Sequence, residues 1–151
     1  MVIHLFWQMD KLTEILSAIA DYAMVCKSMY QTTSNPHIKK MWMDGLRNAI
    51  FYNCSTEIFW SGLQTEACSG KPKSKLSKEH EYGLKKLAEE ILTSNWTKDE
   101  VIENIKVKAK WNYATKEQNQ ILKHNGQDYE KLGIKLIKRR KGAKRKNKYI
   151  S

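Results

Sequence analysis

The positive charge of this chain is concentrated at its C-terminal end, which limits what that end can contribute to a fold. The 151 residues carry a net charge of +11, and the last 21 of them, 131–151, contain ten Lys or Arg and no acidic residue. The first 130 residues hold 17 basic against 16 acidic side chains. Like charges at such a density repel one another unless water or a polyanion screens them. The sequence therefore predicts one globular domain at 1–130, followed by a basic tail at 131–151 that binds nucleic acid.

The first 130 residues are apolar enough to form a core. Hydrophobic residues make up 41% of the chain, and a domain of this length can bury most of the surface of its unfolded form. The opening segment 1–7 is apolar, but it has no basic flank and reaches Asp10 too soon for a signal peptide or a membrane span. We expect it to begin the core, and we expect no membrane association. The three cysteines are odd in number and form no Cys-x-x-Cys motif, which favours a reducing, intracellular compartment.

Helical spacing dominates the chain. Apolar residues recur three or four positions apart from Asp10 to Tyr30, which predicts a first helix with one buried face. Pro36 disfavours helix at the residue before it, so a turn and then a second helix are expected there. The segment 84–92 shows the same helical spacing. The aromatic segment 50–63 fits either a continued helix or two short strands.

One segment changes its period. From Val107 to Tyr113, apolar and polar residues alternate, which predicts a half-buried strand. Capping signals at 97–100 and 115–118 predict helix starts on either side of it, and Gly126 suits the end of the later helix. The predicted fold class is therefore α+β, predominantly helical with a small β element.

Basic residues outside the tail are also candidates for contacting nucleic acid. The segment 69–75 combines Gly and Pro with three lysines and no apolar residue, which predicts an exposed loop. Lys108 and Lys110 stand on the polar face of the predicted strand. Lys and Arg recognise phosphate charge rather than base sequence, so these residues would strengthen binding without selecting a site. The full predicted set of DNA-contacting residues is Lys71, Lys73, Lys75, Lys108, Lys110, Lys138, Arg139, Arg140, Lys141, Lys144, Arg145 and Lys146.

An acidic residue stands beside a histidine at Glu79-His80, after the basic loop and near the predicted start of the 84–92 helix. A neutral imidazole can take a proton from water, and a neighbouring carboxylate can help hold a divalent ion. The alternative interpretation is an ordinary exposed histidine near a helix start. A different nuclease geometry combines Glu57 with Glu103 and Lys106, in which two carboxylates hold the metal and the lysine stabilises negative charge.

The order of motifs between 74 and 136 resembles the HNH, or His-Me finger, endonucleases of phages and homing elements. In that group, an acid-His pair is followed by a helical spacer, a strand and a Thr-x-Glu-x-Asn-x-x-Leu segment. The matching segments here are Ser-Lys-Glu-His-Glu-Tyr at 77–82, Lys-Ala-Lys-Trp-Asn-Tyr at 108–113 and Thr-Lys-Glu-Gln-Asn-Gln-Ile-Leu at 115–122. The chain departs from the group in two respects: no Pro follows the His, and the paired cysteines of a structural zinc site are missing.

The resemblance implies a metal-dependent DNA endonuclease, homing or phage-encoded, which would act in the cytoplasm of a bacterial host. It implies His80 as general base and Glu79 as the acidic ligand of one Mg²⁺ or Mn²⁺ ion. The Asn that braces the catalytic loop is Asn112 or Asn119, and the last metal ligand is Asn119 or His124. A palindromic target would require a homodimer. The alternative function is a non-catalytic nucleic-acid-binding protein that uses its basic tail.

Overall fold

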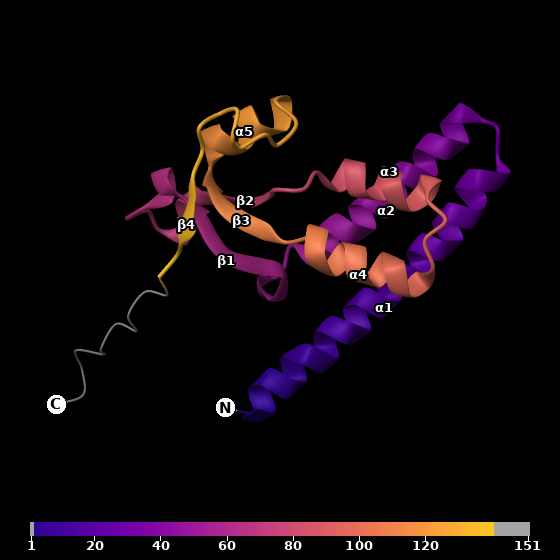
Figure 1. The fold of residues 1–151 in the computed structure, drawn as a ribbon, viewed down its shortest axis with the longest axis horizontal. Helices are drawn as coiled ribbons and strands as arrows, with labels where there is room; N and C mark the ends of the chain where they lie inside the picture. Colours follow the sequence, from indigo (N-terminus) through magenta and orange to yellow (C-terminus); the bar gives the residue numbers. More distant parts are fainter. Residues whose placement is uncertain (1, 141–151) are drawn as a thin grey trace.

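Helices form one end of the molecule and a small mixed sheet forms the other (Figure 1). The computed structural model describes residues 2–140. The predicted fold class, α+β with a helical majority and a small β element, is confirmed. The predicted tail residues Lys141, Lys144, Arg145 and Lys146 lie outside the described residues.

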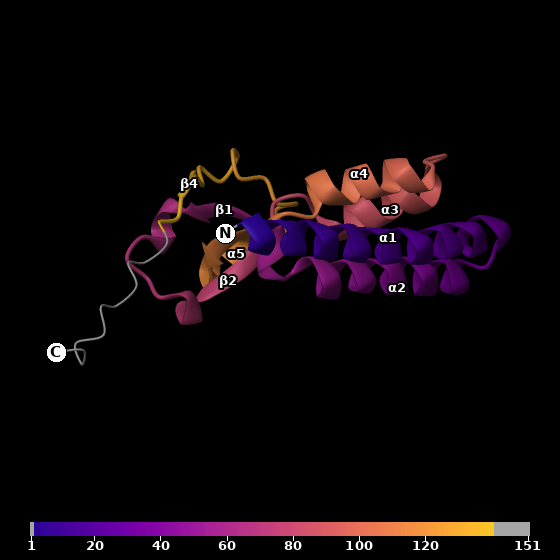
Figure 2. The same cartoon turned by 90° about the horizontal axis from the view of Figure 1, so that it is seen from below.

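Four helices build the helical end. They are α1 (Val2–Thr32), α2 (Pro36–Cys54), α3 (Leu84–Thr93) and α4 (Lys98–Lys108). α1 and α2 lie side by side, and α3 and α4 pack against them (Figure 2). The Asn35 side chain accepts hydrogen bonds from the first backbone N–H groups of α2, and Pro36 fits the first turn, where no N–H partner is needed. The predicted turn and the helix after it are thus confirmed.

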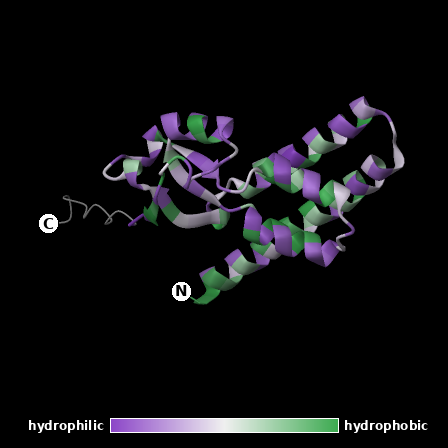
Figure 3. Cartoon of the chain, turned by 45° about the horizontal axis from the view of Figure 1, so that its top comes forward, coloured by the Kyte–Doolittle hydropathy of each residue, from purple (hydrophilic) through white to green (hydrophobic). Residues whose placement is uncertain are grey.

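The apolar N-terminal segment does not begin the core, contrary to the prediction. It is already helical, and Ile3 and Phe6 are 85% and 61% exposed. A helix of 31 residues is about 45 Å long, whereas α2 has 19 residues and α3 and α4 are shorter still. The N-terminal end of α1 therefore extends past the helices against which the rest of it packs, and Figure 3 shows this hydrophobic end projecting from the body.

The sheet has four short strands in the order β2-β3-β1-β4. They are β1 (Trp60–Thr65), β2 (Leu76–His80), β3 (Trp111–Thr115) and β4 (Leu136–Lys138), and the linking segments include the short 3₁₀ helices η1 (Glu57–Phe59), η2 (Glu66–Cys68) and η3 (Lys73–Lys75). β3 is parallel to β1 and antiparallel to β2, while β4 is antiparallel to β1. Helix α5 (Lys116–His124) packs against β2 and β3 (Figure 1).

In two of the predicted segments, the secondary structure changes at positions that the sequence pattern did not mark. The segment 50–63 contains the end of α2, then η1, then the start of β1, so it is neither a single helix nor two strands. The predicted strand from Val107 is wrong in its first part, because α4 continues through Lys108 and β3 begins only at Trp111. The buried residues Val101 and Ile105 keep helical spacing into this region, whereas Val107 is exposed.

The predicted helix starts and stop near the sheet are confirmed. Thr97 with Glu100, and Thr115 with Gln118, each form a capping box in which the two side chains bond to each other's backbone N–H groups. α5 ends at His124, and Gly126 follows with a φ of 65°, a conformation that favours glycine.

The fold continues past residue 130, so the predicted boundary between domain and tail is wrong. β4 pairs with β1 through partners that include Gln64 and Ile137. The Arg139 backbone N–H then donates to the carbonyl of Gly62 at 3.0 Å, and its guanidinium donates to Gln64 Oε1 at 2.6 Å. A short edge strand tolerates flanking charge because its outer side faces water, which is how so basic a segment joins the sheet.

Two further features describe the chain as a whole. Among residues 2–140, no helix has both the length and the apolar character needed to cross a membrane. Cys26, Cys54 and Cys68 are all buried free thiols, in keeping with the predicted lack of a disulfide framework.

The attachment of α5 to the sheet can be tested with two neighbouring residues. Leu122 is fully buried, and Ile121 beside it is 47% exposed. Leu122→Ala should lower the free energy of unfolding by about 2–5 kcal/mol, and Ile121→Ala by about 1 kcal/mol or less, both measured by urea titration. Equal losses from the two variants would contradict this packing of α5.

Candidate active site

Glu79 and His80 are the last two residues of β2, and α3 begins shortly after them at Leu84, near the predicted helix start. They are only 3% and 8% exposed. Glu79 lies opposite Asn112 of β3, and His80 lies opposite Trp111. Successive side chains of a strand point to opposite faces of the sheet, so the two side chains diverge instead of meeting on one face.

His80 is held as a neutral imidazole. Its Nδ1 lies 3.1 Å from the carbonyl oxygen of Ala109, and since a carbonyl can only accept, Nδ1 carries the proton and Nε2 keeps its lone pair. Nε2 lies 3.4 Å from the Ser55 hydroxyl, which donates its own proton to the carbonyl of Phe51. Burial lowers the pKa of His80 to about 4. At neutral pH the ring is therefore in the state that a general base requires.

Glu79 faces the opposite side of the sheet, towards α5. Burial raises the pKa of its carboxyl group to about 7, and the Lys123 ammonium of α5 opposes this effect. Within the part of the chain that the structure describes, no hydrogen bond contributes to that pKa. A carboxylate without a donor is costly to bury unless a positive charge or a proton balances it, so this site favours either protonation or a cation.

Three buried polar atoms lack a hydrogen-bond partner within the described residues, and all three belong to β3, α5 or the segment after α5. They are Asn112 Nδ2, Asn119 Oδ1 and Tyr129 Oη. Burial raises the pKa of Tyr129, and its interaction with the nearby Asn112 side chain opposes this. We call Glu79, Asn112, Asn119 and Tyr129 the α5 cluster. Folded proteins leave few such atoms unpaired, and their presence in segments that border a perturbed carboxyl marks a candidate functional site.

The structure separates the residues that the sequence left as alternatives. Asn119 stands one helical turn before Lys123, whose charge acts on Glu79, and the Asn119 side-chain oxygen is buried. His124 is exposed at the end of α5. Asn112 accepts a hydrogen bond from the Ser61 hydroxyl of β1. Asn119 is thus in the α5 cluster, His124 is outside it, and Asn112 links the cluster to the neighbouring strand.

The ligands that the α5 cluster offers suit a hard cation. Glu79 provides carboxylate oxygens and Asn119 an amide oxygen, which are ligands that Mg²⁺ and Mn²⁺ accept. A cation there would give the unpaired Asn119 Oδ1 a partner. No group of three or more His, Cys, Asp or Glu side chains suited to a metal forms within residues 2–140. Any ion at this place would therefore rely on amide oxygen or water for part of its coordination.

The predicted phosphate-contacting lysines have different surroundings. Lys71, Lys73 and Lys75 are exposed, which confirms the predicted exposed loop. Lys108 is not on a strand face as predicted: it ends α4, and its ammonium pairs with Glu90 at 3.0 Å. The ion pair with Glu90 engages the ammonium group that a phosphate would otherwise contact. Lys110 is exposed just before β3.

The basic residues at the end of the described chain are also divided. Lys138 and Arg140 are exposed, whereas Arg139 is half-buried. The Arg139 guanidinium donates to Gln64 and to the carbonyl oxygen of Lys71. Its orientation is therefore fixed by the sheet and the basic loop together.

The residues of the alternative nuclease geometry, Glu57, Glu103 and Lys106, lie in two separate parts of the fold. Glu57 lies in η1, where it accepts a 3.5 Å hydrogen bond from the Tyr113 hydroxyl. Glu103 and Lys106 are exposed on α4.

The sequence did not predict Tyr129, which belongs to the α5 cluster, or Ser61, which borders it. No local pattern marks them, because each reaches Asn112 only through the tertiary fold, Ser61 from β1 and Tyr129 from the segment after α5.

The two perturbed groups predict opposite effects of pH on stability. The raised pKa of Glu79 means that the folded chain holds the proton of this carboxyl group more tightly than the unfolded chain does. The stability that this proton adds to the folded state is therefore lost as pH rises from about 4.5 to 7. The lowered pKa of His80 means that the folded chain favours the neutral imidazole. The stability that the neutral ring adds to the folded state is therefore lost as pH falls from about 6.5 to 4. Between pH 4.5 and 6.5 the two trends oppose each other in the wild type.

Removing one group should expose the trend of the other. In urea titrations across that range, Glu79→Gln should become more stable as pH rises, and His80→Gln less stable. If both variants kept the slope of the wild type, the buried states assigned to these side chains would be wrong.

Comparison of the chain with protein-family models, with curated proteins and with solved structures found no match. The resemblance to HNH endonucleases therefore stays a prediction from the sequence motifs. In the structure, β2 and β3 form an antiparallel pair, and β3 leads directly into α5, which packs against that pair.

Proposed function

We propose that this protein is a divalent-metal-dependent DNA endonuclease, which hydrolyses phosphodiester bonds at the end of β2. One observation carries the proposal. Among residues 2–140, burial raises the pKa of the Glu79 carboxyl group on β2, and Asn119 Oδ1 of the adjacent helix α5 is buried without a hydrogen-bond partner. A structural core gains nothing from this combination, whereas a cation site requires it.

Glu79 and Asn119 are the residues that would hold the ion in this proposal. When bound, Mg²⁺ or Mn²⁺ would supply positive charge to stabilise the oxygen that leaves the phosphorus. Asn112 serves as a brace, since its amide connects β3 to Ser61 of β1. Lys123, whose charge already acts on Glu79, is available to a neighbouring phosphate.

His80 would act as the general base. The Ala109 carbonyl fixes its proton on Nδ1, so Nε2 is the atom that would accept the proton of the attacking water. In-line displacement places the attacking and leaving oxygens on opposite sides of the phosphorus. His80 and Glu79 point to opposite faces of β2, so base and ion could reach the same phosphate only around the free edge or end of this strand, which is an edge strand of the sheet.

A second candidate function is nucleic-acid binding without cleavage. The low exposure of His80, 8%, favours it, because Ser55 and Phe51 lie against the ring and restrict the approach of a phosphate. The exposed lysines of the basic loop and of β4 would serve this function equally well.

The two functions differ in an assay of DNA cleavage. Purified protein should cut plasmid or long mixed DNA in the presence of Mg²⁺ or Mn²⁺ and not in the presence of chelator. His80→Ala should reduce cleavage by about 10²–10⁴-fold, as expected for loss of a general base. Asn119→Ala should require more Mn²⁺ for half-maximal cleavage, and His124→Ala, on the exposed end of the same helix, should cut like the wild type.

Folding of each variant is checked by urea titration. Cleavage by His80→Ala at the wild-type rate would contradict the assigned base. DNA that is retarded in a gel but never cut, on templates rich in different sequences, would favour the binding function.

A further inference from the structure

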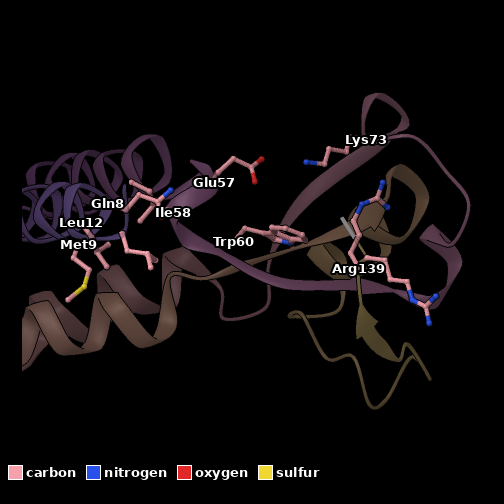
Figure 4. Close-up of a pocket in the computed structure, with 10 residues that line it drawn as sticks. Gln8, Met9, Leu12, Glu57, Ile58, Trp60, Lys73 and Arg139 are labelled. Atoms are coloured by element: carbon pink, nitrogen blue, oxygen red, sulfur yellow. The ribbon is translucent and has the colours of Figure 1, made fainter. Parts of the chain in front are cut away.

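We propose that the pocket between the N-terminal half of α1 and the sheet binds one unpaired nucleotide of a DNA strand, with its base on Trp60 and its phosphate against Lys73, Arg139 and Arg140. This inference rests on the proposed function for its nucleic-acid substrate. The pocket has a volume of about 760 Å³ and is lined from α1, η1, β1, η3 and the end of β4 (Figure 4). That volume lies within the range of about 300–1,000 Å³ typical of small-ligand sites.

The pocket has one apolar wall and one cationic wall. Leu5, Met9 and Leu12 of α1, together with Ile58, form the apolar side. Lys73 and Arg139 lie across Trp60 from them (Figure 4). A nucleotide has this same division between an apolar base face and an anionic phosphate.

Trp60 is fixed in a position suited to stacking. Its indole N–H donates to the Leu63 carbonyl at 3.1 Å. Its ring stacks on Trp111, with centroids 6.2 Å apart and planes at 28°, and meets the edge of Tyr113 at 5.7 Å. Trp60 remains half-buried and lines the pocket, while Trp111 is fully buried. A base on Trp60 would extend a stack that the protein already holds in place.

The cations on the opposite wall are oriented before any ligand binds. Lys73 Nζ lies 5.7 Å from the centre of the Trp60 ring, and Arg139 is fixed by its bonds to Gln64 and Lys71. With Arg140, three positive charges line the pocket against the single negative charge of Glu57. This excess of positive charge complements phosphate, and oriented donors lose less entropy on binding it.

The pocket shares a sheet face with His80. Trp60 pairs with Trp111, and Trp111 pairs with His80, so these three residues form a row across β1, β3 and β2. Two strand spacings separate the ends of the row by about 10 Å. A nucleotide on Trp60 would therefore be close, along the same DNA strand, to a phosphate at His80. The nucleotide must be unpaired, because both faces of a base are covered in a stacked duplex.

The test is fluorescence anisotropy of a labelled oligothymidylate, and of an abasic oligomer of the same length, in chelator. Trp60→Leu should weaken binding of the oligothymidylate by about 5–150-fold and leave binding of the abasic oligomer unchanged. Trp60→Phe keeps an aromatic ring and should recover part of the lost affinity. Trp7→Leu replaces an exposed tryptophan that does not line the pocket and should bind like the wild type.

The proposal is overturned if Trp60→Leu binds oligothymidylate as tightly as the wild type, if Trp7→Leu loses as much affinity, or if binding of the abasic oligomer falls equally. Circular dichroism of each variant confirms that the sheet has formed, and Trp60→Phe provides the test if Trp60→Leu does not fold. Because chelator prevents metal-dependent cleavage, this result is independent of whether the protein cuts DNA.

Discussion

β3 is the strand through which the two halves of the proposed site are joined. All five of its residues are buried, and it pairs with β2 on one side and β1 on the other. Its last residue, Thr115, is also the N-cap of α5. A single short strand thus determines that Glu79 lies beside Asn112, that His80 lies beside Trp111 and that α5 covers β2. Trp111, the first residue of β3, is held in place because its buried indole N–H donates a hydrogen bond to the Thr56 carbonyl at 2.9 Å.

This arrangement gives the two faces of the sheet different chemistry. The α5 face contains a buried carboxyl group and three polar atoms that have no partner among residues 2–140, which is an expensive way to build a core. The other face contains the row from His80 to Trp60, with lysine and arginine around it. In the proposed function, the first face would bind the ion, and the second would hold the base catalyst and the DNA strand. The cost in stability is then explained by function.

Local signals in the sequence predicted the local structure well. The spacing from Asp10 to Tyr30 and the capping residues Thr97 and Thr115 act within one or two helical turns, and the helices they predict are present. Long-range effects were not predictable in the same way. Glu79 and His80 became strand residues because β3 pairs with them from more than thirty positions along the chain. The basic segment joined the sheet because β1 left an unpaired edge for β4. Tyr129 has no motif of its own, and only the folding of the segment after α5 brings it near Asn112 and Glu79.

The most direct test of this account is the location of Mn²⁺ in crystals of the protein, found from its anomalous scattering. If the proposed ion site is present, one peak should lie between β2 and α5, with the Glu79 carboxylate and Asn119 Oδ1 as protein ligands, and crystals of Asn119→Ala should show no peak there. A fully occupied ion bound elsewhere, for example at His124, or the absence of any ion beside Glu79 at saturating Mn²⁺, would contradict it.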